Sequence, residues 1–259
     1  MKDSAPRTLS TVETTCKVID VLEENNGATV TEVAESLSVS PGGAYNHLAT
    51  LANEGYVVKK DGQYELGMKF LNKGRHVIDN NVVYRAGKEV TENLAEETGE
   101  FAHLMTCEHG RGVFLHKSKG ERGISKDFNE MKLKRHDYLH WGSTGKAYLA
   151  HLPPEEAREI IEEHGLPSMN ENTITDPEEL FAEFETIREQ GYAINDQEEI
   201  IGTRAVGAPI ENDKGLYGAI SISGPKSRFT FDNLHAELSD KVLEAANIIS
   251  VNITTLQNQ

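Results

Sequence analysis

Apolar residues recur at helical spacing at the start of the chain. Residues 8–25 predict a helix, because apolar positions three or four apart share one helix face. These apolar positions are Leu9, Val12, Cys16, Ile19 and Leu22. Gly27 ends this helix, and Thr31 is expected to cap a short second helix that turns Val33, Ala34 and Leu37 inward.

A third helix follows after a turn at Val39 and Ser40. It is predicted to run to about Glu54, where Gly55 can adopt the left-handed conformation that ends helices. Residues 56–60 and 63–66 then flank Asp61-Gly62, a strong signal for a two-residue hairpin turn. This order of elements predicts a winged helix-turn-helix over residues 1–66, followed by a linker helix over 67–81.

From residue 82 the pattern alternates between helices and strands. Residues 82–99 predict an amphipathic helix, followed by a hairpin of strands around the turn at 108–112. Further helices are expected over 143–152, 154–164, 177–190 and 232–255, and a second hairpin over 204–224. Helices at both ends with antiparallel strands between them predict an α+β domain with a central antiparallel sheet over residues 82–259.

The third helix begins with residues that are poor helix formers. Gly42 and Gly43 each cost about 1 kcal/mol relative to alanine inside a helix. Ser40 is a good N-cap and Pro41 suits the first helical position. We therefore expect a slender, anion-attracting helix start, continued by Ala44, that can approach a DNA phosphate closely. The alternative is that both glycines lie in a loop and the helix starts later.

The residues after this start supply polar side chains, of which Asn46 can pair bidentately with adenine. In a compatible alternative, the hairpin lysines contact phosphates and the helix reads few bases. The predicted DNA-contacting residues are Thr31, Ser40, Gly42, Gly43, Tyr45, Asn46, His47, Thr50, Lys59 and Lys60.

The charge balance is acidic, with 42 Asp and Glu against 26 Lys and Arg. Phosphate contacts normally dominate DNA affinity, so this net charge of −16 is unusual for a DNA-binding protein. Residues 1–80 hold only 11 acidic against 8 basic residues, and residues 56–75 are locally basic. The acidity therefore lies mainly in the second domain, where it favours a salt-adapted surface; an ordinary solvated acidic helix face gives the same pattern.

Other motifs give no support to catalysis or cofactors. Residues 142–147, GSTGKA, resemble a phosphate-binding loop but lack its first glycine and the hydroxyl that holds Mg²⁺. His103, Cys107, His109 and His116 match no common zinc spacing, and no Ser-His-Asp arrangement has a motif context. We expect no enzyme activity, no cofactor and no metal.

Two cysteines, Cys16 and Cys107, are expected to be buried thiols rather than a disulfide framework. The first residues lack an apolar signal region, and no run of 18 apolar residues occurs. These features predict a cytoplasmic protein without a membrane span.

Two stretches of the second domain resemble the IclR family of transcription regulators. They are GYAINDQEEIIGTRAVGAPIEN at residues 191–212 and GAISISGP at 218–225, and STGKAYLA at 143–150 adds to them. Together with the helix-turn-helix and linker helix, the resemblance covers nearly the whole chain. Asn195 departs from the usual Asp, Ala205 from a common thiol, and Glu211 from an aromatic residue or His. With the acidic balance, the resemblance indicates an archaeal, haloarchaeal type.

The resemblance implies a DNA-binding domain that also dimerises, with tetramers through the second domain as a further option. It also implies a GAF-like second domain that senses small metabolites, often carboxylates. The ligand would touch the backbone amides of Ser143 and Thr144, and Thr203 would lie on its approach. The remaining effector-contacting positions would be Asn195, Ala205, Ser221 and Ser223. The two serines lie two apart on a predicted strand and so share one face, although small residues packing beneath a helix give the same pattern.

The sequence thus predicts a DNA-binding transcription regulator whose second domain senses a small, anionic metabolite, such as a sugar acid or organic acid. Its expected partners are double-stranded operator DNA, that effector and a second copy of the chain. The alternative is an architectural or protein-docking DNA-binding module whose second domain no longer binds a ligand.

Overall fold

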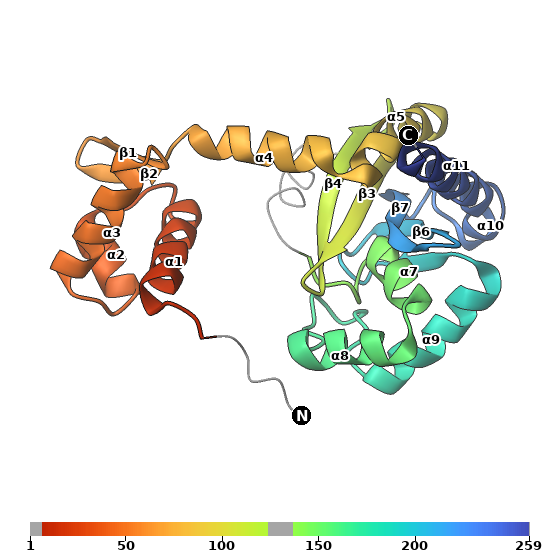
Figure 1. Ribbon diagram of the computed structural model, residues 1–259. Coiled ribbons are helices and arrows are strands. Elements are labelled where there is room, and N and C mark those ends of the chain that lie inside the picture. The colour runs from red at the N-terminus through yellow and green to blue at the C-terminus, as the bar shows by residue number, and fades with distance from the viewer. Residues whose placement is uncertain (1–6, 124–136, 259) are drawn as a thin grey trace. The chain divides into compact units, whose positions relative to one another are not determined.

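A computed structural model describes residues 7–123 and 137–258. The chain separates into two compact units, Met1–Ile78 and Asp79–Gln259 (Figure 1). No helix within the described residues is long and apolar enough to cross a membrane.

The N-terminal unit is a winged helix-turn-helix. Its elements are α1 (Ser10–Glu24), α2 (Val30–Ser36), α3 (Pro41–Asn53), β1 (Val57–Lys60) and β2 (Gln63–Leu66). The linker helix α4 (Lys69–Asn80) follows, and its last two residues belong to the second unit. Val18, Leu22, Val33, Leu48 and Tyr64 belong to one buried cluster that joins the three helices to the hairpin. The predicted order of elements is confirmed.

The turns of this unit have the backbone geometry that their sequences predict. Asp61 and Gly62 have φ values of 50° and 88°, the positive pair that a type I′ hairpin turn requires. Gly55, just after α3, has a φ of 74° and supplies the expected left-handed stop.

The prediction that Thr31 caps the second helix is wrong. The cap is Thr29, whose hydroxyl accepts a hydrogen bond from the backbone N–H of Glu32, while the Glu32 carboxylate accepts one from the backbone N–H of Thr29. This reciprocal pair is a capping box, and its Thr-x-x-Glu signature is present in the sequence. Thr31 is therefore an exposed residue in the first turn of α2.

The apolar stripe of α1 is buried only in its second half. Val18 and Leu22 are in the core, whereas Leu9 and Val12 are 69% and 56% exposed. Cys16 is exposed too, so its prediction as a buried thiol is wrong, and Cys107 is half-buried. The first half of this amphipathic helix has no core to face within its own unit.

The C-terminal unit is an α+β domain around a five-stranded antiparallel sheet of order β4-β3-β7-β6-β5, which confirms the predicted fold class. Its strands are β3 (Phe101–Glu108), β4 (Arg111–Lys119), β5 (Ala193–Asp196), β6 (Thr203–Asn212) and β7 (Gly215–Pro225). Its helices are α5 (Val82–Thr98), α7 (Ser143–His151), α8 (Pro154–His164), α9 (Pro177–Gln190), α10 (Phe231–Asn233) and α11 (Ser239–Gln257).

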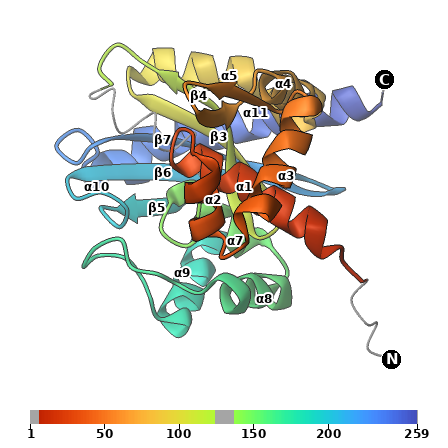
Figure 2. The same ribbon diagram turned by 90° about the vertical axis from the view of Figure 1, so that its left-hand side faces the viewer.

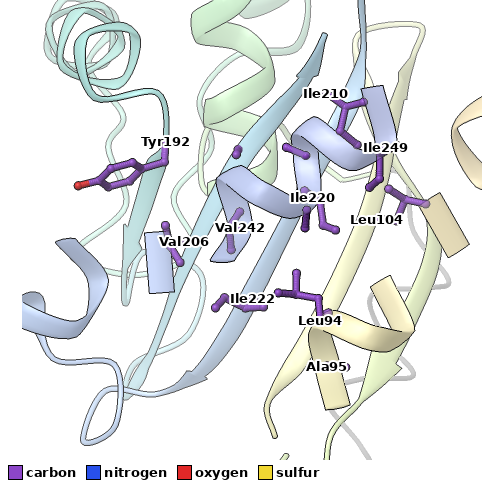
Figure 3. Packing of buried hydrophobic residues seen from close by; sticks show 14 of the residues in the cluster. Leu94, Ala95, Leu104, Tyr192, Val206, Ile210, Ile220, Ile222, Val242 and Ile249 are labelled. Atoms are coloured by element: carbon purple, nitrogen blue, oxygen red, sulfur yellow. The ribbon is translucent and has the colours of Figure 1, made fainter. Parts of the chain in front are cut away.

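Helices cover both faces of this sheet (Figure 2). On one face, α5 and α11 pack on the inward side chains of β3, β6 and β7, where Leu94 and Ile249 meet Leu104, Ile220 and Ile222 (Figure 3). On the other face lies α7, with α9 packed against it.

Two elements differ from the sequence expectation. The four-residue strand β5 was not predicted, because Ala193–Asp196 is too short to give a clear alternation. The C-terminal helical segment begins at Phe231 and contains a π-helical turn, Leu234–Leu238, before α11, an irregularity that apolar spacing does not reveal.

Candidate DNA interface and effector site

Gly42 and Gly43 lie in the first turn of α3, which confirms the prediction that both glycines are helical. Ser40 is the N-cap, and its hydroxyl accepts a hydrogen bond from the Gly43 N–H at 3.1 Å. Pro41 has no N–H, and the Ala44 N–H already bonds to the Ser40 carbonyl. In the described structure, the Gly42 amide therefore remains as the first-turn donor for an approaching phosphate.

The two glycines differ in the space around them. A methyl group built on Gly42 meets no atom within 4 Å, whereas one on Gly43 lies 3.2 Å from the Ser40 hydroxyl oxygen. Gly42 thus borders open space, and Gly43 is close to the cap. A substitution at Gly42 tests access to the helix start without disturbing its cap.

The outward face of α3 carries Tyr45, Asn46 and Thr50. Tyr45 is 52% exposed, and the other two are also exposed. The Thr50 hydroxyl donates a hydrogen bond to the Asn46 carbonyl at 2.7 Å. Ala44 was expected to continue this slender outer surface, but it is fully buried in the core of the unit, because it lies on the same helix face as Leu48.

His47 is turned partly toward α1. Its Nδ1 lies 2.8 Å from the Thr15 hydroxyl, and the residue is half-buried. This ring therefore links α3 to α1 as well as bordering the outward face.

The wing lysines differ in their surroundings. Lys60 forms an ion pair with Glu65 at 2.8 Å, whereas the Lys59 ammonium lies 5.3 Å from the centre of the Tyr64 ring. Further along the basic segment, Lys69 donates to the Glu54 carbonyl and lies over the Tyr56 ring. Part of the local positive charge is thus engaged within the protein.

The candidate effector residues lie on the sheet face that α7 covers. In the strand register, Asn195, Ala205 and Ser223 are lateral neighbours, and Gly207 and Ser221 are neighbours in the adjacent row. Residues aligned in this way point to the same side of a sheet. Thr203 is two residues before Ala205 on β6 and so has the same orientation, at the sheet's end.

The helix α7 begins directly above this face. A methyl group on Gly207 would lie 2.8 Å from the Ser143 carbonyl carbon and 3.0 Å from the Thr144 amide nitrogen. Only a glycine permits this approach of strand and helix backbones. The N-cap of α7 is Gly142, whose lack of a side chain precludes a side-chain cap. The start of a helix attracts anions, and here it lies against the row that contains Ser221.

His103 adds a polar group that the sequence did not assign to this site. It pairs with Ser221 in the register between β3 and β7, and its Nε2 lies 2.9 Å from the Ser223 hydroxyl. His103 is 1% exposed. The alternation of the 101–107 strand, taken with its pairing to β7, could have identified it; without the pairing it resembled any core histidine.

Asn195 has a bracing role in the structure. Its Nδ2 donates to the Trp141 carbonyl at 2.6 Å, and its Oδ1 accepts from the Glu198 backbone N–H at 3.1 Å. Trp141 lies two residues before α7, so the amide ties β5 and the following turn to the start of this helix. An Asp here would lose the donor to the Trp141 carbonyl.

One buried ion cluster lies next to this site. Lys146, in the second turn of α7, is fully buried, and its ammonium donates to Glu183 at 2.7 Å and to Glu198 at 2.6 Å. Burial raises the pKa of the Glu198 carboxyl to about 7, against the opposing effect of Lys146. The lysine of the GSTGKA stretch is therefore an internal ion-pair residue and does not meet a phosphate.

Both parts of the chain match family models. Residues 11–61 match the IclR helix-turn-helix domain, and residues 75–251 match the family described as "Bacterial transcriptional regulator IclR C-terminal". The chain is 34% identical, over 96% of both proteins, to a probable HTH-type transcriptional regulator ArcR of Halobacterium salinarum.

Solved structures agree with this assignment. The Thermotoga maritima IclR structure is 30% identical, with a TM-score of 0.72 over 95% of this chain and 99% of that one. An IclR homologue of Microbacterium hydrocarbonoxydans, solved in complex with 4-hydroxybenzoate, has the same fold at 18% identity, with a TM-score of 0.79 over 95% of this chain and 99% of that one.

The fold and these matches define a transcriptional regulator with an N-terminal DNA-binding domain and a C-terminal effector domain. The chain belongs to the IclR family, whose curated relatives are regulators rather than enzymes.

Proposed function

We propose that this protein regulates transcription. It binds operator DNA through α3, and it binds a small carboxylate at the start of α7. The main support is the meeting of the Ser143 and Thr144 amides with the sheet face of Ser221, Ser223 and His103. Backbone amides at a helix start and hydroxyl donors recognise a carboxylate without needing a paired cation. A sugar acid or a small organic acid has this chemistry.

The ligand of a homologue supports the same class. The Microbacterium homologue was solved with 4-hydroxybenzoate, which is a carboxylate. In our proposal Ala205 and Thr203 line the approach, and Asn195 holds the α7 start in place through Trp141. The like-charge repulsion that an Asp at position 195 would bring is then secondary to the loss of this brace.

For DNA, we propose that Gly42 meets a phosphate and that Asn46, with Tyr45 and Thr50 beside it, reads bases. Asn46→Ala should relax base preference by ~1–3 kcal/mol if its adenine contact is bidentate. Ser40 and Gly43 form the cap. At the edge of this surface, the proposed contacts are with the DNA sugar-phosphate backbone and fix the orientation of the domain. They come from Thr31, His47, Lys59 and Lys60.

We further propose that the chain acts as a homodimer. One short helix reads too few base pairs for genomic specificity, and paired half-sites multiply discrimination. Exposed apolar residues in the N-terminal unit support self-association, namely Leu9 at the N-cap of α1, Val12 on α1, and Leu71 and Val77 on α4. Light scattering at the salt optimum should give a dimer or a tetramer; a monomer would contradict this part of the proposal.

The single tryptophan, Trp141, offers a direct readout of effector binding. It is 8% exposed and lies two residues before α7. Titration with a panel of central-metabolism acids should change its fluorescence, and calorimetry should give the matching affinity. The Ser221→Ala/Ser223→Ala protein should lose binding while keeping its fold, and operator affinity of the wild type should shift when the acid is present.

An architectural or docking module without a working effector site is the competing function. In that case no acid would alter Trp141 fluorescence or operator binding, and genome-wide occupancy would be broad. Discrete promoter sites with ligand-dependent binding support a regulator.

A further inference from the structure

The cluster of Lys146, Glu183 and Glu198 holds more negative than positive charge. One ammonium faces two carboxylates, at 2.7 and 2.6 Å. Lys146 and Glu198 are buried, and the Glu183 side chain is 26% exposed. With both glutamates ionised the cluster therefore carries one net negative charge in a poorly solvated place.

The second oxygens of the two glutamates are short of partners. Among the described residues, Glu183 Oε2 and Glu198 Oε2 are buried without a hydrogen-bond partner. A buried carboxylate oxygen without a donor is unfavourable. A proton on Glu198 would reduce the net charge to zero and leave the Lys146 contact to its other oxygen in place.

Among the groups in the described part of the chain, none besides Lys146 supplies positive charge to Glu198. Asp196, on β5, is engaged with Arg204 at 2.6 Å. The Nε2–H of His140, just before α7, donates to the Pro167 carbonyl at 3.0 Å, and burial lowers the pKa of its imidazole, which favours the neutral ring. On the remaining side, the Asn170 and Thr173 side chains donate to the Glu198 carbonyl and carry no charge.

The cluster is joined to the effector site by covalent and hydrogen-bonded links. Lys146 is three residues after Ser143 on α7. The Glu198 backbone N–H donates to Asn195, which in turn donates to the Trp141 carbonyl before the helix start. A net negative charge in this cluster therefore opposes an anion at the α7 start.

We propose that the Lys146–Glu183–Glu198 cluster is a proton-linked control of the effector site, in which protonation of Glu198 favours binding of an anionic effector. This inference rests on the proposed effector site. By linkage, an anion that binds better to the protonated form draws a proton from solution as it binds. Anion affinity then falls as the pH rises through the neutral range, where the pKa of Glu198 lies at about 7.

The test uses the full-length protein with pyruvate and 4-hydroxybenzoate as carboxylate probes. Calorimetry in two buffers of different ionisation enthalpy measures the protons taken up on binding. The wild type should take up a fraction of a proton near neutral pH and lose about tenfold in affinity as Glu198 ionises. Glu198→Gln, which keeps an acceptor for Lys146, should bind without proton uptake and without this pH dependence.

Asp196→Asn is the matched control, because it removes a carboxylate two residues before Glu198, at the end of β5, and this carboxylate is already paired with Arg204. It should retain the proton uptake of the wild type. Glu183→Gln is a second route, since it also removes one charge of the cluster, and it keeps the test decisive if Glu198→Gln does not fold.

A separate measurement needs no effector. Infrared titration of the wild type should show a buried carboxylic acid that ionises near neutral pH and is missing from Glu198→Gln. If the carboxylic acid that gives this band ionises only in the ordinary acidic range, the proposal fails, whether or not a carboxylate probe binds. If the band behaves as expected and either acid binds without proton uptake, the coupling is wrong. If neither acid binds the wild type or Glu198→Gln at any pH, the proposed effector site fails and the coupling fails with it.

Discussion

Each of the two units contains a helix whose first turn consists of small residues. The two first turns differ in their exposure and in their N-caps. At α3 the first turn is exposed, and Ser40 caps it with a side-chain hydrogen bond. At α7 the first turn is buried, Gly142 stands at the cap position, and Ser143 and Thr144 are 3% and 4% exposed.

Under the proposed function, this difference matches the size of the anion that each start would meet. A DNA backbone can reach only an exposed helix end, and the lack of side chains at Gly42 and Gly43 would give it access. A small carboxylate can enter a buried site, where low solvation strengthens each polar contact. The buried start is also followed by the ion pairs of Lys146, whereas the exposed start is held by its Ser40 cap.

The largest expected effect is on the buried side of this comparison. Lys146→Met would leave Glu183 and Glu198 close together without their shared ammonium. Breaking a buried ion cluster in this way costs about 3–5 kcal/mol of stability. Urea unfolding followed through Trp141 fluorescence at neutral pH measures it.

Lys241→Met is the control, because Lys241 lies 4.0 Å from Glu97 and that glutamate side chain is 63% exposed. A solvent-exposed pair contributes about 1 kcal/mol or less. Equal losses in the two variants would show that the Lys146 cluster does not support the α7 start.

The second prediction concerns the backbone contact below α7. Gly207→Ala places a methyl group 2.8 Å from the Ser143 carbonyl carbon, so strand or helix must shift. Overpacking of this kind costs up to about 3 kcal/mol, and carboxylate binding should be lost with it. Unfolding and Trp141 fluorescence titrations on the same protein measure both effects; a stable variant that still binds the acid would contradict the assigned contact.

The sequence predicted the exposed start more completely than the buried one. Ser40, Pro41, Gly42 and Gly43 act within one turn, and local rules of capping and helix propensity are enough to place them. The wrong cap at Thr31 also concerns one turn, because the Thr29–Glu32 capping box is a local signal in the sequence.

The buried start depends on pairings between distant strands. The family resemblance indicated Ser143, Thr144, Ser221 and Ser223, but the roles of their neighbours follow from the register of the sheet. His103 meets Ser223 across 120 residues of chain. Lys146 on α7 pairs with Glu183 on α9 and with Glu198 in the turn after β5. The local sequence around Lys146 does not reveal these partners, and it resembles an incomplete phosphate-binding loop.

The third prediction separates the charged from the neutral form of the cluster. The folded-state pKa of Glu198 is raised from 4.5 to about 7, so the native state holds this proton more tightly than the unfolded state. Its contribution to stability is therefore complete below about pH 4.5 and is lost as the pH rises toward 7. Relative to Glu198→Gln, the wild type should lose about 2 kcal/mol between about pH 5 and about pH 8.

Paired urea titrations of the two proteins across this range measure that difference, and Asp196→Asn compared with the wild type should not reproduce it. A stability difference that stays constant with pH would mean that Glu198 ionises alike in the folded and unfolded chains.

The smallest effect should appear at the exposed start, with opposite signs for stability and function. Gly42→Ala meets no atom within 4 Å and should raise the stability of the N-terminal unit by up to about 1 kcal/mol, because alanine is the better helix former. The same methyl group lies beside the amide proposed to meet a phosphate, so operator affinity should fall about fivefold, equivalent to about 1 kcal/mol. Hydrogen exchange of α3 amides and operator titration at fixed salt measure the two quantities. Gly43→Ala is the matched variant, and its contact of 3.2 Å with the Ser40 hydroxyl should cancel part of the gain in stability. If Gly42→Ala stabilises α3 and binds operator as well as the wild type, close approach of DNA to this helix start is ruled out, and the glycine there has no role in access.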